Sequence, residues 1–313
     1  MESNSFIESL GMILDESNQF SIMMEDTYYI HEFSLSEYIK KIDFKKIFKF
    51  IFDKFVGILK TIWDRFKAAY NAFTNKSVLI KRYKKQLENI NWDVEIDEER
   101  SMFMNLDSST HINMYKLNLN SLYSTLIQEL EKISNTRNIG DIHTVILDIK
   151  NNSEPTDTYL DQIRGESIGS RSSITKEDYP REVTNYFCPE SKITANVIHP
   201  SETKLYVREY FESKSLEKVI TADESILRST ANNMNNKINS LRLERYIPDQ
   251  QINPEIATDF VQIIRNYCDK CQGICNIYIQ LFSIKLDIFK LYKEQQVRIL
   301  SKIILKSMKE GKI

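Results

Sequence analysis

The sequence predicts a mainly α-helical protein of long amphipathic helices, with a small mixed α/β region in the middle of the chain. The 313 residues include only 7 glycines and 6 prolines, where average usage would give about 20 and about 15. Apolar residues recur at helical spacing over 44–73 and again over 254–308, which favours helices there. So few glycines also leave little material for the phosphate-binding turns of nucleotide-binding folds.

Charge divides the chain more sharply than its formal net charge of −2 indicates. The first 39 residues carry eight acidic side chains and no lysine or arginine, whereas residues 40–88 carry fourteen basic and four acidic ones. Such a reversal is informative about organisation and partners. We therefore expect an acidic leader (1–39), a basic amphipathic helical segment (40–90), a mixed α/β middle domain (91–250) and a long C-terminal helical segment (251–313).

The basic segment contains a long amphipathic helix. Steps of three and four residues, the period of an α-helix, separate its apolar residues Phe44, Phe48, Ile51, Phe55, Ile58, Ile62, Phe66, Tyr70 and Phe73. Trp63 widens this stripe, and the other side carries Lys45, Lys46, Lys49, Lys60 and Lys67. A helix from 44 to 73 would be about 45 Å long. We expect it to end at Asn75 or Ser77, with a further helical stretch over 78–90.

Three interpretations of this helix stay open. The simplest is a helix packed in a bundle with its lysines in solvent. The second is binding to a membrane surface, because lysine-rich helices with aromatic residues such as Phe48, Phe55 and Trp63 on the apolar side lie in the interface plane. The third is non-specific contact with nucleic acid, since lysines neutralise phosphate charge without reading bases.

The middle of the chain predicts short elements of both kinds. Residues 91–112 are expected to form a connector, and 116–134 show a helical pattern. The run His143–Ile149 predicts a strand, and 151–181 predict a surface loop with a short helix near Tyr159–Ile163. Three further β-like pieces are expected at Val183–Phe187, Ile193–Ile198 and Leu205–Phe211. A polar helix is expected over 215–240.

The C-terminal segment opens with a helix start. Asn253, Pro254 and Glu255 supply a capping residue, a proline at the first helical position and an acid in the first turn. Apolar residues then recur to Met308, which predicts one helix of about 50 residues or two helices joined near Gly273. The apolar face of this segment suits an intramolecular core or a coiled-coil seam, so self-association through it stays an open alternative.

Three cysteines are the first candidate for chemistry. Cys268, Cys271 and Cys275 are close in the sequence, and thiolates suit zinc and iron–sulfur clusters. A fourth thiolate would have to come from Cys188, the only other cysteine. The spacing also places all three on one helix face, where free cysteine packs as a small apolar residue. We therefore expect neither a metal nor a cofactor.

The sequence contains no recognisable catalytic constellation. His31, His111, His143 and His199 are scattered and lack the spacing of a local zinc site. The patterns of phosphate loops, dinucleotide-binding turns and nucleophile elbows are absent. We therefore predict no catalytic residues and a protein that is not an enzyme.

The order of segments resembles that of internal virion and prohead-core proteins of large tailed phages, chiefly over residues 1–90, with a weaker echo at Tyr159–Glu166. In some of these phages, a prohead protease cuts such proteins after the glutamate of a Leu/Ile-x-Glu pattern. Similar tripeptides end at Glu16, Glu32, Glu37, Glu98 and Glu129. The first three lie within the acidic leader, close to the point where the charge changes sign.

This resemblance implies a structural protein of the virion interior, present in the host cytoplasm during assembly. Its implied partners are capsid or prohead-core proteins, with non-specific DNA contact. In this hypothesis the leader masks the lysines of the helix until cleavage after Glu16, Glu32 or Glu37 frees them. An acidic tail without a regulatory role is the simpler alternative for the leader. For the whole protein, the alternative is a membrane-active protein, interfacial or pore-forming, whose helix over 44–73 binds bilayers after activation.

Overall fold

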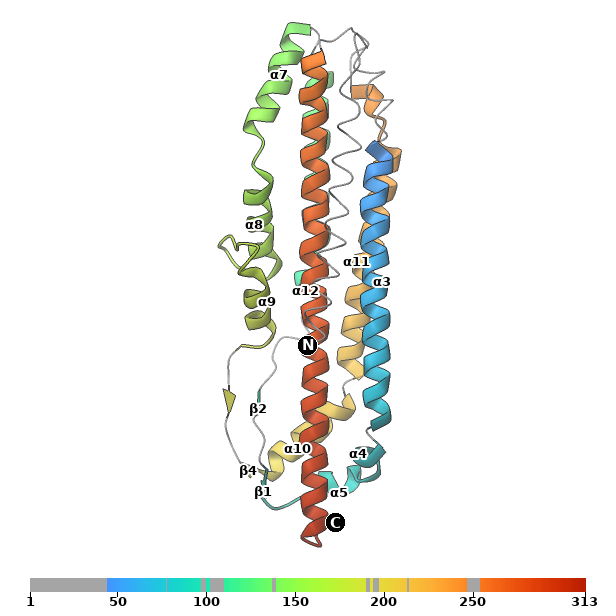
Figure 1. Ribbon diagram of the computed structural model, residues 1–313, viewed down its shortest axis with the longest axis vertical. Helices are drawn as coiled ribbons and strands as arrows, with labels where there is room; N and C mark the ends of the chain where they lie inside the picture. The colour runs from blue at the N-terminus through green and yellow to red at the C-terminus, as the bar shows by residue number, and fades with distance from the viewer. Residues whose placement is uncertain are drawn as a thin grey trace. The chain divides into compact units, whose positions relative to one another are not determined.

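The computed structural model describes residues 44–76, 78–96, 100–101, 110–136, 139–189, 192–193, 197–212, 214–246 and 254–313. They form ten α-helices, one 3₁₀ helix and four two-residue strands (Figure 1). The helices are α3 (Phe44–Lys76), α4 (Val78–Arg82), α5 (Lys84–Glu88), α6 (Thr110–Ser134), α7 (Ile139–Asn152), α8 (Thr156–Ser167), α9 (Tyr179–Phe187), α10 (Pro200–Glu212), α11 (Lys214–Ser240), η1 (Leu243–Tyr246) and α12 (Pro254–Lys309). The strands are β1 (Val94–Glu95), β2 (Arg100–Ser101), β3 (Lys192–Ile193) and β4 (Val197–Ile198). This composition confirms the predicted mainly α fold with a small β component.

The chain divides into two compact units, of which the first comprises 1–43, 131–151 and 242–263. Its described part holds the end of α6, most of α7, η1 and the start of α12. Apolar side chains such as Ile142, Ile146 and Phe260 are buried there. The ammonium of Lys150 lies 2.5 Å from the Asp259 carboxylate and joins α7 to α12.

The second unit comprises 44–130, 152–241 and 264–313. Within it, α3 and α11 pack side by side (Figure 1). The ring of Phe66 on α3 lies 5.7 Å from that of Phe289 on α12. These contacts place the apolar stripe of α3 against two other helices of the unit.

Two small antiparallel ribbons link distant parts of this unit. Val94 of β1 pairs with Ile198 of β4, and Arg100 of β2 pairs with Ile193 of β3. Next to the β1–β4 ribbon, α10 packs on α5. The apolar cluster in this part of the unit contains Ile80, Leu87, Ile90, Val94, Ile96, Ile198, Val207, Ile299, Leu300, Ile303 and Ile304.

The long C-terminal helix is a single continuous element. Ile277, Tyr278 and Ile279 are consecutive and all buried, so the helix is covered all round in its middle turns. Gly273 is not a joint, because α12 continues through it. A Cβ atom at Gly273 would overlap the side chain of Leu160 on α8, so the glycine permits close packing of α8 on α12.

Several sequence predictions of local structure are confirmed. The helix expected over 44–73 is α3, the helical pattern over 116–134 falls within α6, and the polar helix over 215–240 is α11. The short helix expected near Tyr159–Ile163 is α8. For α3 and α6 the spacing of the apolar residues indicated the helix, whereas α11 was predicted as a polar helix.

Three strand predictions are wrong. His143–Ile149 lies within α7, Val183–Phe187 within α9 and Leu205–Phe211 within α10. In α9, Val183 and Phe187 are both buried and lie four residues apart, so helical burial outweighs the β propensity of the local composition. The remaining β-like piece, Ile193–Ile198, is confirmed at its two ends, which belong to β3 and β4, and residues 194–196 between them lie outside the described residues.

Candidate functional site

Helix α3 turns its predicted aromatic stripe into the protein. The exposed fractions of Phe48, Phe55 and Trp63 are 4%, 2% and 7%. The Phe55 ring stacks on Tyr115 of α6 at 5.4 Å between centroids. Buried aromatic side chains of this kind stabilise a core by about 1.5–3 kcal/mol each, so the stripe is part of the folding core of the second unit.

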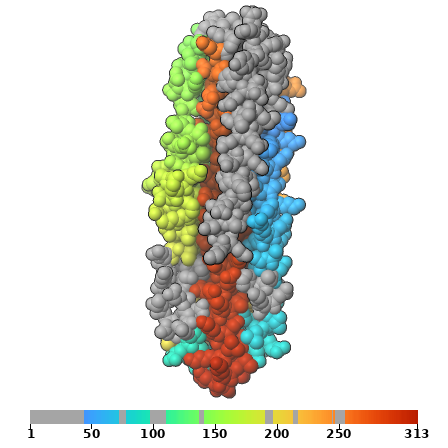
Figure 2. Space-filling view, viewed as in Figure 1, coloured from blue at the N-terminus to red at the C-terminus, as the bar shows by residue number. Residues whose placement is uncertain are grey.

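The lysines of α3 lie on its other side. Lys46, Lys49, Lys60 and Lys67 are exposed and Lys45 is half-buried, and the surface of α3 is visible in the space-filling view (Figure 2). We call the four exposed lysines the lysine face of α3. Asp53 and Asp64 are also exposed on this helix, so the face is mixed but predominantly basic.

One exposed aromatic residue, Phe50, lies beside the lysine face and was not predicted from the sequence. Phe50 is 52% exposed, and the Lys54 ammonium lies 5.5 Å from its ring centroid. Phe50 comes one residue before the buried Ile51 and so lies outside the apolar stripe. This position in the sequence could have indicated that its ring is exposed. An exposed aromatic ring beside lysines adds a stacking surface to a cationic face.

Of the glutamates that end Leu/Ile-x-Glu tripeptides, Glu129 is among the described residues. Glu16, Glu32, Glu37 and Glu98 lie outside the described residues. Glu129 lies inside α6, where burial and a hydrogen bond to Glu129 raise the pKa of Tyr267. Cleavage after Glu129 would therefore require α6 to unfold locally.

The three clustered cysteines of α12 are buried. The Tyr115 hydroxyl lies 3.5 Å from the Cys275 sulfur. Burial raises the pKa of Cys268, and a hydrogen bond with Cys275 together with burial raises that of Cys271. The raised pKa values keep these two side chains as neutral thiols near pH 7. Across the described ranges, no group of three or more His, Cys, Asp or Glu side chains is arranged to hold a metal ion.

A small apolar cavity lies between four helices of the second unit. Its volume is about 20 Å³, which is room for about one water molecule. It therefore has no room for an organic substrate. Its lining residues come from α3, α6, α11 and α12: Phe48, Leu119, Leu122, Tyr123, Leu126, Met234, Ile238, Tyr267 and Cys271.

A buried polar cluster joins three helices of the second unit. The Lys285 ammonium on α12 donates to Asp223 Oδ2 on α11 at 2.6 Å. Nε2 of His111 on α6 lies 4.0 Å from the same oxygen. Burial and the nearby Lys285 lower the pKa of His111 to about 3, so its imidazole is neutral near pH 7. Burial raises the pKa of Asp223, and Lys285 opposes that shift.

A second buried lysine lies two turns further along α12. The Lys293 ammonium donates to Gln296 Oε1 at 2.9 Å and lies 5.4 Å from the Tyr210 ring centroid. Tyr292 donates a hydrogen bond to Glu209 of α10. Burial lowers the pKa of Lys293 to about 8, although Glu209 and Glu217 act in the opposite direction. Both lysines occupy positions inside the apolar pattern of α12, a signal that the sequence analysis passed over.

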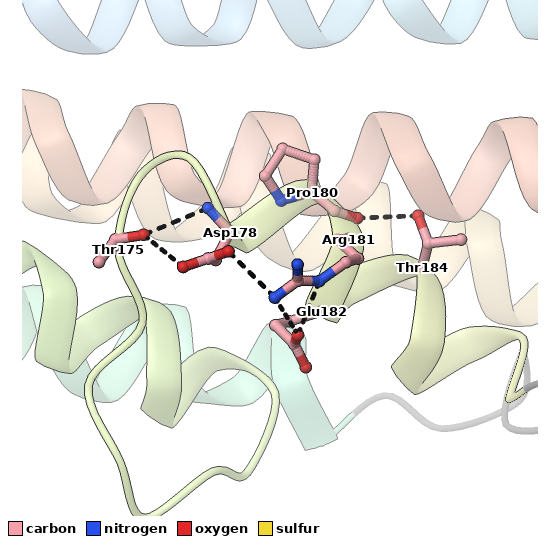
Figure 3. A network of polar contacts seen from close by, with 6 residues as sticks. All are labelled: Thr175, Asp178, Pro180, Arg181, Glu182 and Thr184. Atoms are coloured by element: carbon pink, nitrogen blue, oxygen red, sulfur yellow. Dashed lines mark hydrogen bonds and ion pairs between the residues drawn. The ribbon is translucent and has the colours of Figure 1, made fainter.

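An exposed polar network spans the start of α9 (Figure 3). The Thr175 hydroxyl donates to Asp178 Oδ2 at 2.9 Å and accepts from the Asp178 backbone N–H at 3.3 Å. The Arg181 guanidinium lies 3.0 Å from Asp178 and 3.2 Å from Glu182. The Thr175 hydroxyl thus satisfies the backbone N–H of Asp178 just before the helix, and the ion pairs are between exposed side chains, so this network has a structural explanation.

Comparison with protein-family models, with curated proteins and with solved structures finds no match for this chain. None of the helices that the structure describes is long and apolar enough to cross a membrane. A functional proposal therefore depends on the geometry of the described residues, and above all on the separation of the two sides of α3.

Proposed function

We propose that this protein is a non-enzymatic structural protein of a phage virion or prohead interior, whose lysine face on α3 binds an anionic partner. The observation that carries the proposal is the orientation of α3. Its aromatic stripe is buried, while Lys46, Lys49, Lys60 and Lys67 are exposed. The exposed side of α3 is therefore mainly charged, with Phe50 as an exposed aromatic residue beside the lysines.

The lysine face suits neutralisation of charge without sequence readout. Lys46 and Lys67 are 21 residues apart along α3, which corresponds to about 32 Å of helix. Lysine acts as a point charge on a flexible stem, in contrast to the planar, bidentate arginine. An extended anionic surface, such as packaged DNA or an acidic capsid lining, matches this spread of separated charges.

The acidic leader is the proposed regulator of this face. Its eight acidic side chains precede the basic segment directly in the sequence. Cleavage after Glu16, Glu32 or Glu37 would remove much of that negative charge. The intact mass and N-terminal sequence of the protein from its native particle test this step. A start at Ser17, Phe33 or Tyr38 supports maturation, whereas a start at Met1 or Glu2 contradicts it.

Binding to the lysine face is tested separately from cleavage. We would measure double-stranded DNA binding at several salt concentrations with the four lysines changed to glutamine. Loss of four phosphate contacts should reduce the slope of log K against log salt by about 3–4. The matched control changes Lys116, Lys132, Lys204 and Lys218, which are also exposed, to glutamine. Equal slopes in the two variants would contradict a role for α3.

The membrane-active alternative stays a second proposal, because α3 combines lysines with a continuous aromatic stripe. Phe48, Phe55 and Trp63 are buried, so this function requires α3 to leave α6 and α11 first. Dye release from anionic liposomes by the full chain, and by the product that begins at Tyr38 after cleavage at Glu37, tests it. Leakage by the shortened product that is lost in Trp63→Ser but retained in Phe50→Ser supports membrane insertion of the stripe.

A further inference from the structure

His111 is a buried imidazole without the hydrogen bonds that such a group normally makes. Its exposed fraction is 2%, and neither ring nitrogen has a hydrogen-bond partner among the residues that the structure describes. More than about 90% of buried polar groups in proteins are hydrogen-bonded. Asp223, which is also buried, leaves Oδ1 without such a partner in the same part of the chain. The cluster is therefore incompletely satisfied.

The groups around His111 come from each helix that contacts it. Helix α12 contributes Lys285, and α11 contributes Asp223, whose Oδ2 already accepts from that lysine at 2.6 Å. Helix α9 contributes Tyr186 and Phe187, with ring centroids at 6.4 Å and 5.1 Å from the imidazole. On α6 itself, Tyr115 lies one turn away, and its pKa is raised by burial.

A proton on His111 would be badly placed in this environment. The imidazolium would lie near the buried ammonium of Lys285, and the single carboxylate of Asp223 would have to serve both cations. Like charges in a desolvated core repel strongly because little solvent screens them.

We propose that His111 makes the second unit acid-labile, because protonation of its imidazole separates α6 from α9, α11 and α12. The inference is independent of the proposed phage function. Its consequence reaches α3, because Phe55 stacks on Tyr115 of the same helix α6 at 5.4 Å. Loosening of α6 would therefore uncover the aromatic stripe of α3 from one side.

The sign of the pH dependence follows from the two states of the histidine. In the unfolded chain His111 takes up a proton near pH 6.5, whereas burial and Lys285 lower its pKa in the folded protein to about 3. Below pH 6.5 the unfolded state binds the proton and the folded state does not. Folding stability therefore falls as the pH is lowered through this window, and the contribution of His111 is fully present above it.

The test is denaturant unfolding of the full chain between pH 7.5 and pH 4.5. Relative to His111→Gln, the unfolding equilibrium constant of the wild type should rise by up to about tenfold for each pH unit below 6.5. His143→Gln is the matched control, because His143 is a half-buried histidine of α7 in the first unit. It should follow the wild type. Identical pH dependence in the wild type and His111→Gln would overturn the proposal.

A second measurement decides the question if His111→Gln does not fold. Nitrogen-15 NMR of the imidazoles in the wild-type protein reports the protonation of each ring directly. We expect His111 to be neutral at pH 5 in molecules that keep their near-UV circular dichroism. A ring that becomes protonated with a midpoint near pH 6.5, while the near-UV signal is unchanged, would overturn the proposal.

Discussion

Helices α3 and α12 both carry lysines among aromatic residues, but they place these lysines in opposite environments. On α3 the lysine face is exposed and the aromatic stripe is buried. On α12 Lys285 and Lys293 are 0% and 4% exposed and lie against the rings of Phe187 and Tyr210. The difference arises because the four lysines of α3 lie on its exposed side, whereas Lys285 and Lys293 lie on sides of α12 that are buried.

The comparison shows that the position of a helix, rather than its composition, decides what a lysine contributes. An exposed lysine has a hydrated charge, and its pairing contributes at most about 1 kcal/mol. A buried lysine has lost its hydration and depends on a protein partner, as Lys285 depends on Asp223. Removing a lysine should therefore affect binding on α3 and folding on α12.

The largest expected effect comes from breaking the buried pair. Lys285→Met should destabilise the protein by about 3–5 kcal/mol, because Asp223 would stay buried without its cation. Urea unfolding at pH 7 measures this. The double variant Lys285→Met with Asp223→Leu should regain most of the loss, since an apolar pair needs no compensation. A single variant that loses less than about 1 kcal/mol would contradict the interpretation.

Glycines on the two helices sharpen the same comparison. Gly273→Ala on α12 should destabilise the protein by about 1–2 kcal/mol, because the new methyl group would overlap Leu160. Gly57→Ala on α3 should stabilise it by about 0.5–1 kcal/mol, since no atom lies within 4 Å of the added carbon. Thermal unfolding of both variants measures the difference. Combined with Leu160→Ala, the Gly273→Ala change should cost less stability. If both glycine variants were destabilised, or both stabilised, the two helices would not differ in how closely neighbours pack on them.

Lys293 gives a smaller effect that depends on pH. Burial lowers the pKa of Lys293 to about 8, whereas the unfolded chain keeps its proton to about pH 10.4. The folded state therefore loses the proton first, and stability should rise by about 1 kcal/mol between pH 8 and pH 9. Lys293→Met should remove this rise in denaturant unfolding. If the stability of Lys293→Met rose equally between pH 8 and pH 9, groups other than Lys293 would be responsible for the rise.

The lysine face should give the smallest effect on folding. Changing Lys46, Lys49, Lys60 and Lys67 to glutamine should alter stability by no more than about 0.5 kcal/mol per site, because these side chains are exposed. Thermal unfolding of the fourfold variant measures this beside the DNA-binding experiment. A cooperative loss of structure would show that the face packs against another part of the protein, and would weaken its role as a binding surface.

Local periodicity determined much of the fold. The courses of α3 and α12 follow from apolar residues three and four positions apart, because one buried side is enough to define a helix. The same reasoning failed at His143–Ile149. There the β-branched run predicted a strand, while burial of Ile142, Ile146 and Ile149 belongs to a helix. Propensity over a few residues is weak compared with packing.

The sequence alone therefore determined the mainly helical fold, the charge reversal and the separation of lysines from aromatics on α3. Only the tertiary structure decided that Lys285 pairs with Asp223 across 62 residues of sequence, that His111 joins them, and that α12 passes straight through Gly273. These features depend on which helices exclude water from a given side chain. Desolvation is set by neighbours distant in the sequence, and no local pattern of residues contains that information.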